Sequence, residues 1–352
     1  MATAFINGKE VFFEPGITIL EAARGAGIFI PVLCEHPALE IVGACRICLV
    51  EIENSPKLQA ACSTPIAENM VIYTDSEKVL EARRGVVELM LVRHPLDCFS
   101  CSANGACLLQ NIAYDLGIES SSYKDDSIKR KTLPIEDSNP FYIRDMNKCI
   151  LCGRCIRVCT SHAQYRAIDF QNRGIDTIVE PPSGRDLEHS DCKFCGQCVA
   201  VCPVGALADK PSLGKGRPWE LDTVKTVCPY CGVGCELLVK VNRRTGKIAA
   251  VTTDHTNTKS LTKGRSCVKG RFSWEFRESG DRLTSPLIKE NGVFRKASWD
   301  EALDTVANGL KRNMGSTGFF SSARCTNEDN YLMQRFAREV MGTNNIDHCA
   351  HL

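Results

Sequence analysis

The residues of this chain best suited to chemistry are its cysteines, which number 21 among 352 residues. Nineteen of them fall into five groups, and only Cys325 and Cys349 stand apart; we interpret these two as small buried residues. The segment Met1–Glu10 has no basic stretch followed by an apolar one, so it does not indicate secretion. Disulfides are rare in a reducing cytosol, and clustered cysteines in such a chain therefore indicate metal binding.

Two of the five groups form an internal repeat. The run Cys-x2-Cys-x2-Cys-x3-Cys occurs twice, 43 residues apart. It resembles the runs of two-cluster 4Fe-4S ferredoxins, in which the fourth cysteine of each run binds the other cluster. This resemblance implies that each cube takes three ligands from one run and one from the other: Cys149, Cys152, Cys155 and Cys202 for the first cube, and Cys192, Cys195, Cys198 and Cys159 for the second. Zinc is poorly suited to eight thiolates in this interleaved order.

The residues around the repeat largely follow the same pattern. Pro203 follows the last cysteine as the pattern requires, whereas Thr160 stands where the first run usually has proline, which would only loosen the turn. Four basic residues near the runs would offset the negative charge of the clusters, or form an ordinary solvated face: Lys148, Arg154, Arg157 and Lys193.

The first group joins two closely spaced cysteines to two distant ones: Cys34, Cys45, Cys48 and Cys62. A pair separated by two residues lets one tight loop present both sulfurs to a single centre, and Gly43 and Ala44 keep that loop small. The stretch Gly43–Val50 resembles the 2Fe-2S domains at the N-termini of respiratory NADH dehydrogenase large subunits and iron hydrogenases. The resemblance implies a 2Fe-2S cluster in a β-grasp ferredoxin-type domain, with a structural zinc site as the alternative.

The second group adds a histidine to three cysteines: His94, Cys98, Cys101 and Cys107. Three thiolates leave a cube one ligand short, and a neutral imidazole nitrogen can take the fourth place, which would raise the potential of the cluster. The spacing His-x3-Cys-x2-Cys-x5-Cys resembles the His-Cys-ligated 4Fe-4S module of the same families. A structural role for His94 is the alternative. The other histidines have no matched role and are interpreted as structural or exposed: His36, His162, His189, His255, His348 and His351.

The fifth group is Cys228, Cys231, Cys235 and Cys267, whose spacing alone would also suit a zinc ribbon. The stretches Val227–Cys235 and Gly264–Arg271 closely resemble the first domain of molybdopterin oxidoreductases, and of formate dehydrogenases in particular. In that family the domain holds a 4Fe-4S cluster, and a lysine two residues after the fourth cysteine lies between cluster and pterin. Lys269 matches this lysine, so the resemblance implies an electron relay; a lysine in a turn is the alternative.

The resemblance to formate dehydrogenase catalytic subunits continues beyond Cys267. Four further stretches carry it: Arg282–Leu287, Ser298–Leu303, Ser322–Arg324 and Thr326–Glu328. In that family, the segment similar to Asn344–Ala350 runs almost directly into the cysteine or selenocysteine that ligates the metal. We therefore expect the ligand directly after Leu352, as a selenocysteine whose UGA codon was taken as a stop. An arbitrary boundary or a natural short protein is the alternative.

These groups must be positioned by several small domains, and we predict an α+β, multidomain chain. The pattern predicts five parts: a 2Fe-2S ferredoxin-type domain (1–78), a His-Cys 4Fe-4S module (79–118), a two-cluster 4Fe-4S ferredoxin domain (138–210), a molybdopterin oxidoreductase 4Fe-4S domain (221–277) and the incomplete start of the molybdopterin-binding catalytic domain (278–352). Residues 115–140 read as a surface connection, and the Gly-, Pro- and Lys-rich residues 203–220 as an interdomain linker.

Local signals predict the main elements. Asn7-Gly8 and Thr245-Gly246 each indicate a hairpin, and residues 77–93 have a helical pattern. Three helices are expected to begin at capping residues, namely Thr18 with Glu21, Ser298 with Glu301, and Thr326. The first should end near Ala26, the second near Leu310 and the third at Gly342, and Phe319-Phe320 suggests a short buried strand.

Charge and hydropathy exclude several classes of protein. A formal charge of +1 argues against a nucleic-acid binder, and 43% hydrophobic residues argue against a disordered chain. No apolar stretch approaches the ~20 residues of a membrane span, so we expect a cytoplasmic protein without one. The resemblance implies one 2Fe-2S and four 4Fe-4S clusters here, and molybdenum or tungsten bis-molybdopterin guanine dinucleotide in the full-length protein.

The function implied by the resemblance is formate oxidation to carbon dioxide, or the reverse, by the full-length enzyme. This chain would be its electron-transfer arm, since it lacks the metal ligand and most of the pterin pocket. Electrons would run from the metal centre past Lys269 to the Cys228 group, then through the two cubes to the His94 and Cys34 groups. A partner redox protein is implied: a flavin- and NAD(P)-binding subunit, a ferredoxin or a hydrogenase. The alternatives are a dedicated electron-transfer subunit and an NADH dehydrogenase large-subunit-like protein.

Overall fold

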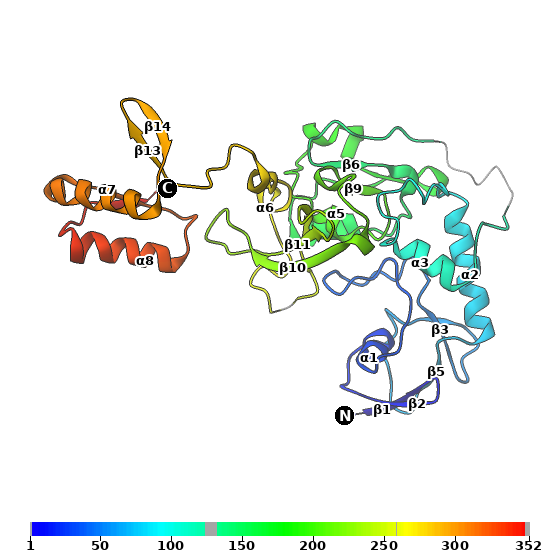
Figure 1. Cartoon of the computed structure of the whole chain (residues 1–352). Coiled ribbons are helices and arrows are strands. Elements are labelled where there is room, and N and C mark those ends of the chain that lie inside the picture. Colours follow the sequence, from blue (N-terminus) through cyan, green and yellow to red (C-terminus); the bar gives the residue numbers. More distant parts are fainter. Residues whose placement is uncertain (1, 124–131, 258, 349–352) are drawn as a thin grey trace.

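The computed structural model describes residues 2–123, 132–257 and 259–348. Over these residues the strands form one sheet of five, one of three and four of two. The N-terminal sheet, the central region and the pair of helices near the C-terminus follow one another as separate parts, and an extended segment leads to the last of them (Figure 1). This succession of small mixed units confirms the predicted α+β, multidomain organisation. None of the helices described is both long and apolar enough to cross a membrane.

The N-terminal sheet has the strand order β2-β1-β5-β3-β4, with β1 parallel to β5 and antiparallel to β2. Its elements are β1 (Ala2–Ile6), β2 (Lys9–Phe13), α1 (Ile19–Gly25), β3 (Leu49–Ile52), β4 (Gln59–Ala60) and β5 (Val71–Tyr73). The predicted hairpin is confirmed, with Asn7 and Gly8 both at positive φ in its turn. The predicted capping box is also present, since Thr18 and Glu21 each accept a hydrogen bond from the other's backbone.

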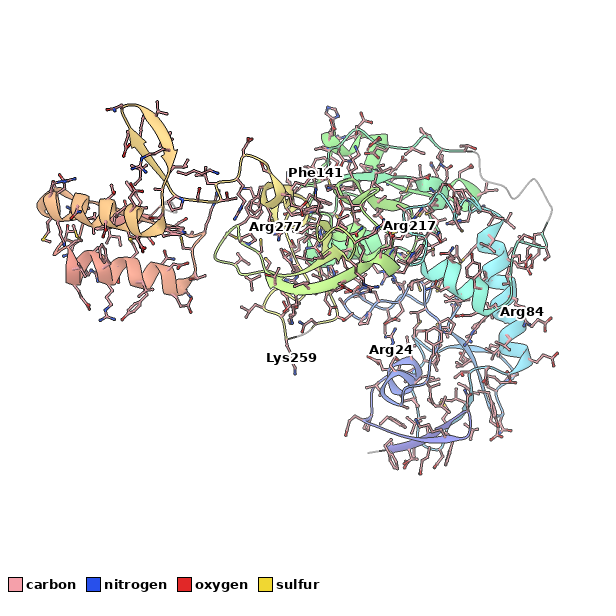
Figure 2. The ribbon with its side chains drawn as sticks, viewed as in Figure 1. Arg24, Arg84, Phe141, Arg217, Lys259 and Arg277 are labelled. Atoms are coloured by element: carbon pink, nitrogen blue, oxygen red, sulfur yellow. The ribbon has the colours of Figure 1, made fainter. Side chains whose placement is uncertain are left out.

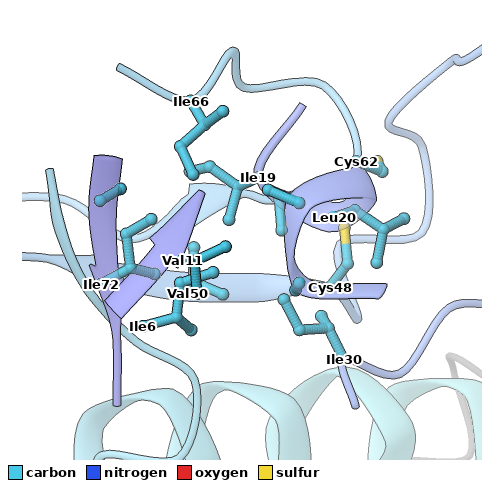
Figure 3. Close-up of a cluster of buried hydrophobic side chains, with 14 of the residues drawn as sticks. Ile6, Val11, Ile19, Leu20, Ile30, Cys48, Val50, Cys62, Ile66 and Ile72 are labelled. Atoms are coloured by element: carbon cyan, nitrogen blue, oxygen red, sulfur yellow. The ribbon is translucent and has the colours of Figure 1, made fainter. Parts of the chain in front are cut away.

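One apolar core holds this sheet and α1 together. Ile6 and Ile72 from the sheet face Ile19 of α1, and all three side chains are fully buried (Figure 3). Cys48, directly before β3, and Cys62, just after β4, belong to the same core, so two of the candidate ligands are packed into it. The loop that contains Cys34 and Cys45 is therefore anchored to a packed unit rather than to a free end.

A helical module follows the sheet. Helix α2 (Glu77–Leu91) begins at Ser76, whose hydroxyl accepts a hydrogen bond from the backbone of Val79, and α3 (Leu108–Asp115) begins directly after Cys107. The predicted helix is therefore confirmed, although it ends two residues before Arg93. The core of the module combines its own Val87, Leu109 and Ile112 with two residues that are distant in sequence, Leu33 and Val204.

The repeat occupies the centre of the molecule. Its elements are β6 (Tyr142–Arg144), α4 (Arg154–Arg157), a π-helical turn (Val158–His162), β7 (Asp169–Gln171), β8 (Ile178–Glu180), α5 (Gln197–Val201) and β9 (Leu207–Asp209). Strand β6 pairs with β9 and β7 with β8, both antiparallel. Each short helix begins after a glycine in the left-handed conformation, Gly153 (φ 69°) and Gly196 (φ 70°), so the two halves share the same local geometry.

A three-stranded antiparallel sheet comes next, with the order β10-β11-β12. It is formed by β10 (Leu221–Val227), β11 (Glu236–Asn242) and β12 (Ile248–Thr252), and the short helix α6 (Val268–Phe272) follows it. The hairpin predicted around Thr245-Gly246 is confirmed as the β11–β12 connection. Phe272 of α6 stacks on Phe141 of the repeat, with ring centroids 5.4 Å apart, which ties this sheet region to the centre.

The remaining residues form a separate α/β unit. Its elements are β13 (Leu287–Glu290), β14 (Val293–Lys296), α7 (Trp299–Arg312), β15 (Phe319–Ser321), α8 (Asn327–Arg335), a π-helical turn (Phe336–Val340) and β16 (Ile346–His348). Strand β15 is parallel to β16, and α7 lies beside α8 in the view of Figure 1. Thr326 and Asp329 cap α8 reciprocally, which confirms the predicted start of that helix.

Three local predictions were wrong. Residues 203–220 are not a free linker, because β9 lies among them and pairs with β6. Ser298 does cap α7, but Glu301 does not complete the box, because its carboxylate pairs with Arg295 instead. The short strand predicted at Phe319-Phe320 is present as β15, but its predicted burial is wrong, since Phe320 is 85% exposed.

The two isolated cysteines have different outcomes. Cys325 was expected to be buried but is exposed, because it lies in the turn between β15 and α8 with nothing packed over it. Cys349 and His351 lie outside the described residues. Part of the predicted surface connection, residues 124–131, lies outside them as well.

Candidate metal centres

All eight cysteines of the repeat line a single cavity at the centre of the molecule. The space not filled by protein atoms is about 820 Å³, including the part that opens to solvent, and the other lining residues are largely apolar, among them Tyr142, Ile168 and Val179. Within it Cys202 lies close enough to Cys149 to interact electrostatically with it, although 53 residues separate them. The structure thus gathers the eight predicted ligands around one apolar space.

The proximity of the sulfurs follows the interleaved order expected from the sequence. Cys202 interacts with Cys149 and Cys152 from the first run. Cys159 interacts with Cys192 from the second run. Cys202 also interacts with Cys155, and Cys159 with Cys195 and Cys198. Each run therefore places its fourth cysteine near the first three of the other, which is the arrangement that two interleaved cubes require.

Backbone amides point at the sulfurs in both halves of the repeat. The Leu151 amide donates to the Cys149 sulfur and the Phe194 amide to the Cys192 sulfur, both at 3.4 Å. Leu151 and Phe194 have φ values of 55° and 51°, which are rare for residues with side chains. The two loops adopt the same strained conformation, and hydrogen bonds from amides to sulfur are the means by which proteins tune iron–sulfur clusters.

Burial opposes the charge that a thiolate ligand must carry. It raises the pKa of Cys155 well above its usual value and that of Cys198 to about 12, while the pKa of Cys202 is also raised. Such thiols would stay neutral in a dry cavity unless a cation compensated their ionised form. Iron supplies that compensation, so the donor set and the apolar enclosure fit two clusters.

The first group is gathered at the edge of the N-terminal sheet. The amide of Cys34 donates to the Cys45 sulfur at 3.4 Å, and the amide of Cys45 donates to the Cys34 sulfur at 3.5 Å. The hydrogen bond between these two side chains lowers the pKa of Cys34 and raises that of Cys45. Cys48 and Cys62 interact in the same way. The four sulfurs therefore form two close pairs, as the ligands of a 2Fe-2S centre should.

His94 has one ring nitrogen available as a ligand. Its Nδ1 lies 2.9 Å from the carbonyl of Pro95, to which it can donate, whereas its Nε2 is buried and has no hydrogen-bond partner. Burial also lowers the pKa of the imidazole, which favours the neutral form that binds metals. In the same module Cys101 and Cys107 are buried and Cys98 is half-buried. The orphaned imidazole nitrogen has the chemistry required of the fourth ligand in the predicted His-Cys cluster.

The His94 group touches the repeat directly. A methyl group on Gly205 would lie 2.4 Å from the Cys101 sulfur, and the Leu108 amide donates to the carbonyl of Pro203 at 2.9 Å. Arg217, labelled in Figure 2, donates to the carbonyl of Cys101 at 2.7 Å. The segment after Cys202 thus packs against this group, which the sequence did not indicate.

The first group also touches the repeat, through two arginines of α4. Arg154 donates to the carbonyl of Glu35, and Arg157 donates to the carbonyls of Cys34 and Cys152. The sequence predicted that these arginines would offset cluster charge. Their hydrogen bonds also join the Cys34 loop to the first run of the repeat, a role visible only in the structure.

The fifth group is the most open of the five. Cys228 is buried, Cys235 is half-buried, and Cys231 and Cys267 are exposed. Cys228 nevertheless lies close enough to both Cys231 and Cys267 to interact electrostatically with them. In residues 2–123, 132–257 and 259–348, no three His, Cys, Asp or Glu side chains surround a point that one metal ion could occupy.

The α6 helix connects the fifth group to the second run of the repeat. Lys269, the predicted relay, lies exposed in α6 two residues after Cys267. Arg271 of the same helix is buried and donates to the carbonyl of Cys195 at 3.2 Å. The burial of Arg271 was not predicted, because a basic residue at the end of a short helix carries no sign in the sequence that it will be buried.

Three unassigned histidines meet where three parts of the chain join. His255 has its ring centroid 6.1 Å from that of His36 and 6.0 Å from that of His162. Burial is the main cause that lowers the pKa of His36 to about 4 and that of His255 to about 3. His36 and His255 are therefore neutral, and all three rings pack together at the junction, whereas His189 is exposed; this is consistent with the structural or exposed roles expected for them.

Family comparisons divide the chain in the same order as the cysteine groups. Five family models match in succession: a 2Fe-2S iron-sulfur cluster binding domain (residues 1–77), the NADH-ubiquinone oxidoreductase-G iron-sulfur binding region (83–122), a 4Fe-4S dicluster domain (148–206), the molybdopterin oxidoreductase Fe4S4 domain (221–279) and molybdopterin oxidoreductase (282–352).

Curated relatives match across almost the whole chain. The NADPH-Fe(3+) oxidoreductase subunit alpha of Geobacter sulfurreducens is 41% identical over 100% of this chain, and an NADH-quinone oxidoreductase subunit of Rhizobium meliloti is 37% identical over 99%. A Staphylococcus aureus protein named "Putative formate dehydrogenase" is 33% identical over 98%. The chain spans 40% of the length of the first two and 38% of the third.

One solved structure is similar in both sequence and fold. It is the crystal structure of an NAD+-reducing [NiFe]-hydrogenase in the H2-reduced state, one chain of which is 32% identical with a TM-score of 0.54. The match covers 59% of this chain and 87% of that one.

Proposed function

Since the chain belongs to the molybdopterin oxidoreductase family and forms its iron–sulfur electron-transfer part, we propose that its five ligand groups hold one 2Fe-2S and four 4Fe-4S clusters. The 2Fe-2S cluster would be held by the Cys34 group, and the cubes by the His94 group, the two interleaved sets of the repeat and the Cys228 group. The single observation that carries this proposal is the apolar cavity lined by all eight cysteines of the repeat. The domain boundaries given above are proposed with it.

The contacts between the groups support an order for the electron path. Arg271 joins the fifth group to the loop of Cys195, which belongs to the second cube of the repeat. The first cube has two neighbours, because Arg157 joins it to the Cys34 loop and Gly205 abuts Cys101. We therefore place the fifth group, the second cube and the first cube in series. The path then divides toward the Cys34 and His94 groups.

The full-length protein is proposed to oxidise formate to carbon dioxide, or to catalyse the reverse. Residues 282–352 match the molybdopterin oxidoreductase family, and the relative named for formate dehydrogenase is 33% identical. The proposed cofactor is bis-molybdopterin guanine dinucleotide with molybdenum or tungsten, which supplies two-electron chemistry when bound. Lys269 would lie on the side of the fifth cluster that faces this cofactor and would act as a relay. The clusters, which each carry one electron at a time, would then take up the two electrons in succession.

A redox partner is proposed at the N-terminal end. The relatives named above include subunits of NADH-quinone and NADPH-Fe(3+) oxidoreductases, which supports a flavin- and NAD(P)-binding partner subunit, with a ferredoxin or hydrogenase as the other candidates. Ile41 and Val42, exposed in the loop between Cys34 and Cys45, provide an apolar surface for such a partner. The cytoplasm is the proposed location.

A second candidate function is that of an NADH-quinone or NADPH oxidoreductase large subunit. Its support is the higher identity to relatives with those names, 41% and 37% against 33%. An anaerobic test on the full-length protein separates the candidates. Formate alone should bleach the clusters if the first proposal holds. Clusters that stay oxidised with formate but are reduced by NAD(P)H and the flavin-binding partner would favour the second.

A further inference from the structure

Arg271 is a buried cation placed between two of the proposed clusters. It lies in α6, four residues after Cys267, and is only 2% exposed. Its Nε donates to the carbonyl of Cys195 at 3.2 Å, and its Nη2 donates to the hydroxyl of Thr253 at 2.9 Å. The guanidinium therefore reaches from the fifth group into the loop of the second cube.

The hydrogen-bond partners of this guanidinium are both neutral. Burial lowers the pKa of Arg271, and no carboxylate in the described part of the chain forms an ion pair with it. Asp209 is an acid in its electrostatic surroundings, but burial raises the pKa of Asp209 to about 7, so at neutral pH this acid is only partly ionised. A buried arginine stays charged, and an unpaired buried charge is unfavourable unless anions lie near. The sulfurs of Cys195, Cys198 and Cys267 lie in its electrostatic surroundings, and as ligands of the proposed clusters they would be anionic.

The loop of the second cube is shaped to admit this side chain. A Cβ on Gly196 would lie 2.4 Å from Cδ of Arg271 and 2.5 Å from the ring of Phe272. The matching glycine of the first cube, Gly153, would meet only Phe170, at an ordinary 3.4 Å. Both glycines have the same left-handed φ. Only Gly196 must also lack a side chain so that Arg271 can approach its backbone closely.

We propose that Arg271 is the shared counter-charge of the fifth cluster and the second cube, which favours the reduced form of both. This inference rests on the proposed ligand sets. Each cluster with four thiolate ligands is anionic and gains one negative charge when it accepts an electron, and no proton is needed for that step. A fixed positive charge between them stabilises both reduced forms, so an electron passes from one to the other without a large change in potential.

The test is a redox titration of the anaerobic full-length protein, followed by electron paramagnetic resonance. At the wild-type midpoint potential, Arg271→Gln should lower the ratio of reduced to oxidised cluster about tenfold for the two flanking clusters. The Cys34 and His94 clusters should not change. Arg271→Lys keeps the charge and should restore most of the ratio. Lys193→Gln removes an exposed charge beside Cys192 and should change the ratio less than twofold.

The outcomes separate this inference from the proposed function. Arg271→Gln protein with all its signals and wild-type ratios would overturn the inference and leave the clusters in place. If Arg271→Gln loses a flanking cluster, the Arg271→Lys variant distinguishes the two explanations. A wild-type ratio of reduced to oxidised cluster in Arg271→Lys supports the role of the positive charge. Loss of the same cluster in Arg271→Lys shows that the shape of arginine is what matters and overturns the inference. Wild-type protein without clusters would instead refute the proposed function.

Discussion

The sulfur of Cys101 lies against the backbone of Gly205, so closely that a methyl group there would stand 2.4 Å from it. Gly205 belongs to the segment after Cys202, whereas Cys101 belongs to the His94 module. Because of this contact, the site of the proposed His94 cluster depends on how the segment that follows the first cube packs against it. A substitution in one module should therefore be detected in the spectrum of its neighbour.

Gly205→Ala should disturb the His94 cluster. The added methyl group overlaps the Cys101 sulfur, and overpacking of this kind costs typically ~1–3 kcal/mol. We expect the spectroscopic signal of that cluster to shift or disappear while the Cys34 signal stays. Gly85→Ala is the matched control, because its methyl group enters open space in α2 and should stabilise the helix by ~0.5–1 kcal/mol. An unchanged His94 signal in Gly205→Ala would contradict the packing described here.

His94→Ala should remove one 4Fe-4S signal and leave the Cys34 centre intact. The substitution deletes Nε2, the buried ring nitrogen that lacks a hydrogen-bond partner. His94→Cys should keep a cluster with a lower potential, since thiolate is more anionic than imidazole. His189→Ala, at an exposed position, is the control and should change nothing. An unchanged iron content in His94→Ala would remove His94 from the ligand set.

Acidification should loosen the junction around His255. Its pKa is about 3 in the folded chain against a usual 6.5, so the folded state disfavours the charged form. The stabilisation is complete above pH 6.5 and is lost as pH falls from 6.5 toward 3. Between pH 7 and 5 the loss is on the order of 2 kcal/mol.

Hydrogen exchange of the amides in β12, measured at pH 7 and pH 5, checks the effect of His255. Exchange should speed up in the wild type after correction for its intrinsic pH dependence. His255→Gln can still bond to Gln197 but does not titrate, so its response should be smaller. The pKa of His36 is lowered as well, so its protonation should speed up exchange in both proteins. His255→Gln should therefore keep part of the pH response. Equal responses of the wild type and His255→Gln would speak against a role for this histidine.

Removal of the clusters should unfold the repeat before the N-terminal sheet. The repeat surrounds a cavity lined by its eight cysteines, whereas the sheet is held by apolar side chains such as Ile6, Ile19 and Ile72. After anaerobic treatment with an oxidant and a chelator, amide protection in β6 and α5 should fall to that of a disordered chain. Protection in β1 should persist. Equal protection of both regions would show that the repeat does not need its clusters.

Local patterns predicted the parts of this protein whose causes are local. Asn7-Gly8 and the Thr18–Glu21 pair predicted the first hairpin and helix, because turn and capping energies depend on a few neighbouring residues. The spacing of the cysteines predicted the five groups for a similar reason, since a tight loop brings closely spaced sulfurs together. Phe320 and Cys325 were mispredicted, because an apolar residue type does not reveal what covers it.

The contacts between modules could not be predicted in this way. Arg157 bonds to the carbonyl of Cys34, and Arg271 to that of Cys195, across 123 and 76 residues of sequence. Such pairs depend on how separate cores dock, and nothing local in the sequence indicates which carbonyl either arginine will contact. The order of the proposed electron path came from these contacts.

The most direct test of the central claim is the iron and acid-labile sulfide content of the anaerobically purified protein, combined with Mössbauer spectroscopy. One 2Fe-2S and four 4Fe-4S clusters require about 18 iron and about 18 sulfide per chain, with the Mössbauer spectrum divided in the ratio of one small cluster to four large ones. Colourless protein that lacks acid-labile sulfide, or that binds zinc in place of iron, would contradict the account.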